Sequence, residues 1–154
     1  MVFRLRQDKN SPVLQNHIAT IENILSMLDV NPSEARAHTM ESYRWAFRWG
    51  SVEVDVNIME RGSRAFFQVT APIIYLPDSQ RENLLYGILE LNLEMTSAAM
   101  GVYRDVIYVF SERPIEGMDA EEARFIITQV AHYADELDHR LVQDFGGRLY
   151  HPQP

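Results

Sequence analysis

The sequence contains no cysteine, and this absence excludes disulfide bonds and thiol catalysis. It fits a reducing compartment, so we expect a cytoplasmic protein. No apolar run approaches the roughly 18 residues that a membrane-spanning helix needs. Residues 1–10 carry charges but no apolar stretch of a secretory signal. We therefore expect neither a disulfide scaffold nor a membrane partner.

Lysine is also nearly absent, since Lys9 is its single instance, and the formal net charge is −8 at pH 7. Nucleic acids are bound largely through cationic side chains that neutralise phosphates, so this charge disfavours nucleic acid as a partner. The glycines form no phosphate-binding GxGxxG or GxxxxGKS/T motif, and no Gly-x-Ser-x-Gly motif marks a nucleophile. The sequence thus indicates no catalytic residue and no cofactor.

What is present is the composition of one ordinary globular domain, with 46% hydrophobic and 23% charged residues in 154. We expect a flexible N-terminus at residues 1–10, a single domain at 11–146 and a C-terminal tail at 147–154.

Three stretches have the apolar spacing of helices. The first begins at Pro12, where a missing N–H costs nothing. In the second, Ser79 and the residue before it are both N-cap candidates, and Glu82 follows Ser79 at the spacing of a capping box. The third starts after the N-cap candidate Asp119 and ends at Gly146. The expected buried positions of the first helix are Leu14, Ile18, Ile21, Leu25 and Leu28.

Strict alternation over residues 43–49 and 52–58 predicts an antiparallel hairpin with Gly50-Ser51 as its loop. This register makes every pair on one face apolar, beginning with Trp49 opposite Val52.

A third strand continues this meander as far as Leu76. A loop at Arg61-Gly62 sets Ile58 opposite Ala65 and keeps the apolar residues on one face. Pro72 cannot donate a ladder hydrogen bond, so it should lie at an edge or a bulge.

A second hairpin is predicted from residues 99–103 and 106–110, with Arg104-Asp105 at the bend. It sets Val102 opposite Ile107, and the other face is apolar too. Either this hairpin is buried on both sides, or it offers an exposed apolar patch to a partner.

In chain order the elements are α-βββ-α-ββ-α, with residues 33–38 expected as a loop or short turn. This order predicts an α+β fold, a five-stranded antiparallel sheet with its helices on one face.

His132, Glu136 and His139 share a face of the last predicted helix, a spacing that can hold zinc. That face is opposite the apolar stripe and lacks the HExxH order, so an ordinary surface is the favoured interpretation. The nearby carboxylates of Asp135 and Asp138 are expected to be solvated, whereas acid–base chemistry needs a dry site. A metal-dependent enzyme is kept as one hypothesis.

Arg44 and Arg48, with Phe66 and Tyr108, supply the basic and aromatic groups that stack bases on some sheet surfaces. The alternative interpretation is that these arginines pair with acidic residues of the next strand and that the surface is buried against a second subunit, and the net negative charge favours it. Binding of single-stranded nucleic acid is a second hypothesis.

Three segments resemble the YbjN-type family of bacterial sensory-transduction regulators: VTAPIIYLPDSQRENLLYGILELN, AAMGVYRDVIYVFSERPIEGMDAEE and HYADELDHRL. That family is similar in fold to type III secretion chaperones, small acidic dimers that hold an extended segment of a client protein. The resemblance implies a non-enzymatic, homodimeric chaperone-like or adaptor protein that binds a partner protein, and it brings no catalytic residue.

We expect the dimer or partner contact on the second predicted helix and the second hairpin. Its expected residues are Leu85, Ile88, Leu89, Met95, Tyr103, Val106, Tyr108 and Phe110.

Overall fold

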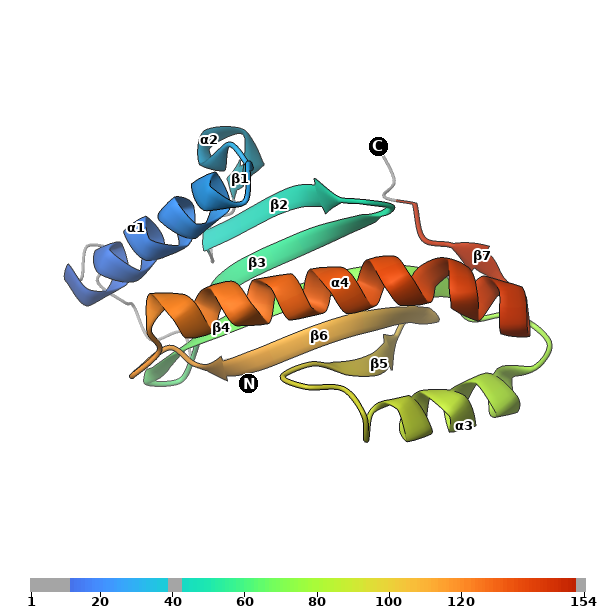
Figure 1. Ribbon diagram of the computed structural model, residues 1–154. Coiled ribbons are helices and arrows are strands. Elements are labelled where there is room, and N and C mark those ends of the chain that lie inside the picture. The colour runs from blue at the N-terminus through green and yellow to red at the C-terminus, as the bar shows by residue number, and fades with distance from the viewer. Residues whose placement is uncertain (1–11, 39–42, 152–154) are drawn as a thin grey trace.

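The computed structural model describes residues 12–38 and 43–151, so the expected flexible N-terminus and the end of the tail lie outside the described residues (Figure 1). The helices are α1 (Pro12–Met27), α2 (Pro32–Ala35), α3 (Arg81–Leu91) and α4 (Ala120–Phe145). The strands are β1 (Arg36–His38), β2 (Tyr43–Trp49), β3 (Val52–Arg61), β4 (Arg64–Tyr75), β5 (Ala99–Tyr103), β6 (Val106–Pro114) and β7 (Arg148–Leu149).

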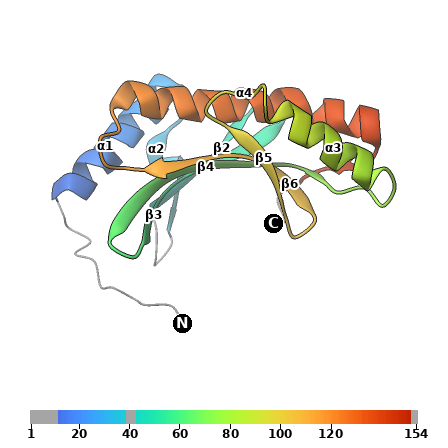
Figure 2. The same cartoon turned by 90° about the horizontal axis from the view of Figure 1, so that it is seen from below.

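The strands form one antiparallel sheet in the order β1-β2-β3-β4-β6-β5, with β7 paired to the far end of β4. Figure 2 shows α1, α3 and α4 on the same side of this sheet, which we call the helix-covered face; the other side is the open face. The α+β fold is confirmed, but the sheet has seven strands rather than five. Residues 33–38, expected as a loop or turn, form most of α2 and all of β1, because strands this short show no alternation in sequence.

The predicted register of β2 and β3 is confirmed along its whole length. The register of β3 and β4 is wrong by two residues, since Ile58 lies opposite Phe67 rather than Ala65. The turn is Gly62-Ser63, and Gly62 has a φ of +65°, which glycine adopts without strain. A shift of two residues leaves every side chain on the same face, so the apolar pattern could not distinguish the two registers.

β4 is a central strand whose ladder with β3 ends where Thr70 lies opposite Asp55. Hydrogen-bonded pairs recur at every second residue of such a hairpin, so the next would join Glu53 to Pro72, which has no N–H. The expected bulge is found here, because the register with β6 shifts between Pro72 and Ile74. Beyond Pro72, the side of β4 that β3 has left is taken by β7.

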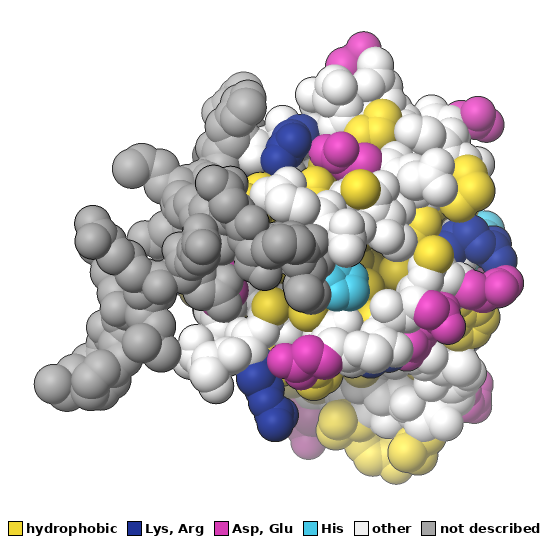
Figure 3. All heavy atoms as spheres, turned by 90° about the vertical axis from the view of Figure 1, so that its left-hand side faces the viewer, with side chains coloured by type: hydrophobic (Ala, Val, Ile, Leu, Met, Phe, Trp, Pro, Cys, Tyr) yellow, Lys and Arg dark blue, Asp and Glu magenta, His cyan; other side chains and the backbone are white. Residues whose placement is uncertain are grey.

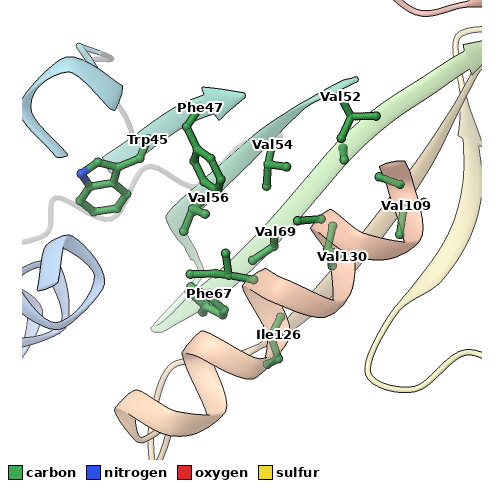
Figure 4. Close-up of a cluster of buried hydrophobic side chains, with 14 of the residues drawn as sticks. Trp45, Phe47, Val52, Val54, Val56, Phe67, Val69, Val109, Ile126 and Val130 are labelled. Atoms are coloured by element: carbon green, nitrogen blue, oxygen red, sulfur yellow. The ribbon is translucent and has the colours of Figure 1, made fainter. Parts of the chain in front are cut away.

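The core lies between α4 and the helix-covered face of the sheet. Figure 4 shows side chains from β2, β3 and β4 gathered with those of α4. Trp45, Phe67 and Ile127 are fully buried, and the indole Nε1 of Trp45 donates to Glu22 Oε1 over 3.3 Å. Each such apolar side chain contributes about 1.5–3 kcal/mol by leaving water.

The predicted N-terminal cap is confirmed for α4 and wrong for α3. Asp119 caps α4 as predicted, because its carboxylate accepts from the N–H of Glu122 over 2.8 Å. The capping box predicted at Ser79 is wrong: α3 starts at Arg81 behind Gln80, whose φ is +63° and whose side chain makes no cap. Instead, Arg81 Nε donates to the carbonyl of Pro77 over 2.7 Å and holds the preceding loop.

Candidate protein-binding surface

α3 has two apolar faces, and only one of them is used within the chain. Leu84 and Ile88 are buried, whereas Leu85 and Leu89, each one residue further on, are exposed. The helix also comes close to the end of α4, where a Cβ on Gly87 would lie 3.4 Å from the ring of Phe145. The inner face of α3 thus completes the core, and its outer face stays in water.

The β5–β6 hairpin next to α3 has the predicted register, with Val102 opposite Ile107 and the bend at Arg104-Asp105. Both bend residues have left-handed φ values, 49° and 60°, as a type I′ turn requires. Val102 belongs to the helix-covered side and Tyr103 to the open face, and both are exposed. The hairpin therefore presents apolar groups on both faces at one edge of the sheet.

Exposed apolar side chains thus gather at this end of the molecule, on the outer face of α3 and on both faces of the hairpin, and we call this set the α3–hairpin surface. Its members are Leu85, Tyr86, Leu89, Leu93, Val102, Tyr103 and Phe110. The most exposed among them are Leu89 at 67% and Leu93 at 89%. At the opposite end of the molecule, around α1, Figure 3 shows hydrophobic side chains interspersed with acidic, basic and histidine side chains.

A side-chain amide partly caps the sheet edge in this surface. Asn92, just after α3, accepts from the N–H of Met100 over 2.7 Å and donates to its carbonyl over 3.1 Å. These two bonds mimic a neighbouring strand at one residue of β5. Val102, two residues on, directs its backbone groups the same way, because these directions alternate along a strand.

The expected contact residues fall into three groups. Leu85, Leu89, Tyr103 and Phe110 are exposed in the α3–hairpin surface. Met95 and Tyr108 are half-buried. Ile88 and Val106 are buried within the chain itself and add nothing to the exposed area.

Sequence reasoning missed Tyr86, Leu93 and Val102, all of them exposed. Leu93 continues the i, i+4 spacing of Leu85 and Leu89 beyond the helix end, and this signal was available in the sequence. Tyr86 and Val102 carry no such signal.

The residues considered for nucleic-acid binding lie on the open face, but Arg44 is occupied there. Its Nη2 lies 2.6 Å from Asp55 Oδ1 and its Nε donates to the same oxygen over 2.8 Å. Burial raises the pKa of Asp55, and the Arg44 charge opposes that rise. Arg48 Nε donates to the carbonyl of Gly50, and Phe66 lies under the guanidinium of Arg61. The pairing that the alternative interpretation predicts is thus confirmed for Arg44, which binds an acidic residue of the next strand, whereas Arg48 donates to a turn carbonyl.

The carboxylates on α4 correct one expectation. Asp138 is only 2% exposed, whereas the sequence placed it in water, and its Oδ2 accepts from Ser51 Oγ over 2.6 Å. The N–H of Ser51 donates to Asp135 Oδ1 over 2.8 Å, and the single hydroxyl hydrogen of Ser51 is shared between Asp138 and Asp135 Oδ1, which lies 2.8 Å from Oγ. The bonds to Ser51 lower the pKa of Asp135. The two carboxylates therefore anchor the β2–β3 turn to α4.

This anchoring also shapes the neighbouring turn and histidines. Gly50 has a φ of +55°, and a Cβ there would overlap the Asp135 carboxylate. His132 packs edge-on against Trp49, and His139 Nδ1 lies 2.6 Å from Asp138 Oδ1. Within residues 12–38 and 43–151, no group of three or more His, Asp or Glu side chains is placed to hold a metal ion.

A family model covers nearly all of this architecture. It is described as T3SS (YopN, CesT) and YbjN peptide-binding chaperone 1, and it matches residues 20–153. The chain therefore belongs to this family of peptide-binding chaperones. None of the curated proteins compared with the chain matches it.

Solved structures share the fold at low sequence identity. The crystal structure of the ExsC–ExsE complex matches with a TM-score of 0.59 and 8% identity, over 82% of this chain and 94% of that one. YbjN from E. coli matches with a TM-score of 0.52 and 14% identity, over 88% and 96%. The HopA1–SchA chaperone–effector complex matches with a TM-score of 0.52 and 10% identity, over 78% and 93%.

These comparisons confirm the resemblance to YbjN and the type III secretion chaperone-like fold. At such identities the structures establish the shared fold alone. Among the residues that the structure describes, no helix has both the length and the apolar character to cross a membrane.

Proposed function

We propose that this protein is a non-enzymatic, cytoplasmic homodimer that holds an extended segment of a partner protein, as a chaperone or adaptor. Membership in a family of peptide-binding chaperones supports the partner class. Two structures with this fold are complexes, ExsC–ExsE and HopA1–SchA, and the latter is a chaperone–effector pair. The observation that carries the proposal is the α3–hairpin surface, which a chain acting alone would leave in water.

The occupant proposed for this surface is a second copy of the chain. Large exposed apolar patches mark interaction sites, and each square ångström removed from water contributes roughly 25 cal/mol. A two-fold axis near Leu89 would bring the same apolar patch of two copies together, as an isologous interface requires. Val102, which lies on the same side of the sheet as α3, extends the contact from the helix to the sheet edge.

The dimer is tested by changing Leu89→Glu and measuring mass by sedimentation equilibrium. We expect the unchanged chain to be dimeric and the variant to be monomeric with an unchanged circular dichroism spectrum. Met27→Glu is the matched control, because Met27 is 59% exposed on α1, outside the α3–hairpin surface. A monomeric unchanged chain, or a Leu89→Glu variant that stays dimeric, would contradict the proposed interface.

The client is tested by affinity capture from the native lysate and by rebuilding the complex from purified components. We expect one partner at a fixed ratio, with a stretch of its chain protected from limited proteolysis. An empty capture with folded, dimeric protein would argue against the chaperone function.

A further inference from the structure

β7 occupies a place along β4 that the rest of the sheet leaves open. The chain leaves α4 through Gly146 and Gly147, whose φ values of 80° and 94° suit glycine, and then runs back along β4. Leu149 lies opposite Ile74, and the N–H of Tyr150 donates to the carbonyl of Ile73 over 2.8 Å. Figure 1 shows β7 beside the far end of β4, next to the C-terminal end of α4.

The place exists because β4 runs on past the end of β3. The β3 ladder stops at Thr70, and β3 itself begins at Val52, so the last residues of β4, from Ile73 to Tyr75, have no β3 residue paired with them. We call this edge segment, with the side chains around it, the β4 slot. On its other side β4 stays paired with β6, so the slot is a fixed template for one added strand.

The tail contacts the slot on both faces of the sheet. Leu149 packs against the hydrophobic core on the helix-covered side. On the open face the Arg148 guanidinium lies 4.0 Å from the centre of the Tyr75 ring, and the ring of Tyr150 lies 5.4 Å from that of Tyr75. Tyr108 lies on the same face, opposite Pro72 and two residues along β6 from Val106, the partner of Tyr75.

The strand β7 is held only weakly in the β4 slot. β7 has two residues, and an isolated strand pairing of this length is marginal in water. Its attachment gains from a short tether, which gives an effective concentration on the order of millimolar. A segment from another protein with the same side-chain pattern would compete with the tail for the slot.

We propose that the β4 slot is the strand-addition site for the client, and that residues 148–151 are an internal stand-in that the client displaces. The occupant is an extended segment with the pattern of the tail: a cation over Tyr75, an aliphatic residue facing the core, and an aromatic residue beside Tyr75. This inference rests on the proposed peptide-binding function. The proposal places the client and the second copy of the chain at different sites, because β6 lies between the β4 slot and the edge strand β5.

The test uses a fluorescein-labelled peptide with the sequence of residues 147–154, GRLYHPQP, added to the full chain. In the unchanged chain the tail fills the slot, so binding should be weak. Leu149→Asp puts a charge where the tail meets the core and frees the slot, so we expect binding at least ten-fold tighter by fluorescence anisotropy. Adding Tyr75→Ala to that variant should abolish the gain, and a GRDYHPQP peptide should not bind.

A second, milder variant guards against misfolding of the first. Gly147→Ala places a Cβ 3.0 Å from the Tyr75 carbonyl at a left-handed φ, so it loosens the tail and leaves Leu149 intact. If both variants are folded and bind the peptide no better than the unchanged chain, the β4 slot is not a binding site. That failure would contradict the β4 slot but not the proposed chaperone function. If the peptide binds and the protein captures no cellular client, the chaperone function is contradicted and the slot is not.

Discussion

In the half of the sheet built by β2, β3 and β4, apolar side chains face α4 and mostly polar ones face the open side, whereas β5 and β6 carry apolar side chains on both faces. The first half satisfies its burial within one chain, because α4 lies along it. The second half meets α3 on one side and leaves Tyr103 and Phe110 in water on the other. The apolar side chains of the first half are therefore buried within one chain, while the second half leaves some of its own exposed.

The largest effect is expected when a substitution in the core is compared with one on the α3–hairpin surface. Phe67→Ala empties a site that is 0% exposed, so we expect a loss of about 3–5 kcal/mol in the free energy of unfolding. Leu89→Ala, at an exposed position, should change the stability of the monomer by no more than about 0.5 kcal/mol. Urea unfolding at low protein concentration measures both. Comparable losses would mean that the two halves do not differ as argued.

A smaller effect is expected at the junction that joins α4 to the β2–β3 turn. Ser51→Ala removes the hydroxyl donor from the buried Asp138 carboxylate, which should cost about 1–3 kcal/mol. Ser63 provides the matched control, because it lies in the other hairpin turn of the meander and is exposed. Ser63→Ala should leave the urea midpoint unchanged. If the two serines behave alike, the anchoring by Asp135 and Asp138 has no energetic weight.

The half of the sheet built by β2, β3 and β4 was also easier to predict from the sequence. Alternation from Trp45 to Ile58 defined both faces and the β2–β3 register, because one face is buried and a one-residue slip would expose it. It could not place the β3–β4 turn, since a shift of two residues leaves the faces unchanged. β1 and β7 escaped prediction because strands of two or three residues carry no period.

The candidate surfaces were predictable in chemistry rather than in extent. The doubly apolar hairpin was visible in sequence, and so were the expected contacts Leu85, Leu89, Tyr103 and Phe110. The burial of Ile88 depends on the angle at which α3 meets α4, and periodicity does not specify that angle. The buried Asp138 was missed because its partner Ser51 lies far away in sequence.

The smallest expected effect is a difference in acid sensitivity between two carboxylates, Asp135 on α4 and Asp55 on β3. Hydrogen bonds from Ser51 lower the pKa of Asp135 below its ordinary value of 3.8, so this group stabilises the fold above that value. The contribution is lost as the pH falls through the lowered pKa. Burial raises the pKa of Asp55, so its charge costs stability at neutral pH, and the cost vanishes as the pH falls below 3.8.

Asp135→Asn should therefore make the loss of stability in acid shallower, and Asp55→Asn should make it steeper. Urea midpoints measured from pH 7 down to about pH 3 cover the range where both carboxylates titrate. The two residues are matched in type and differ in what they meet: hydroxyl and amide donors at Asp135, and a desolvated position beside Arg44 at Asp55. Shifts of the same sign would mean that burial, not hydrogen bonding, dominates at both sites. Opposite shifts would show that the turn at Ser51 holds α4 through a charge that the fold stabilises, while the open face holds one at a cost.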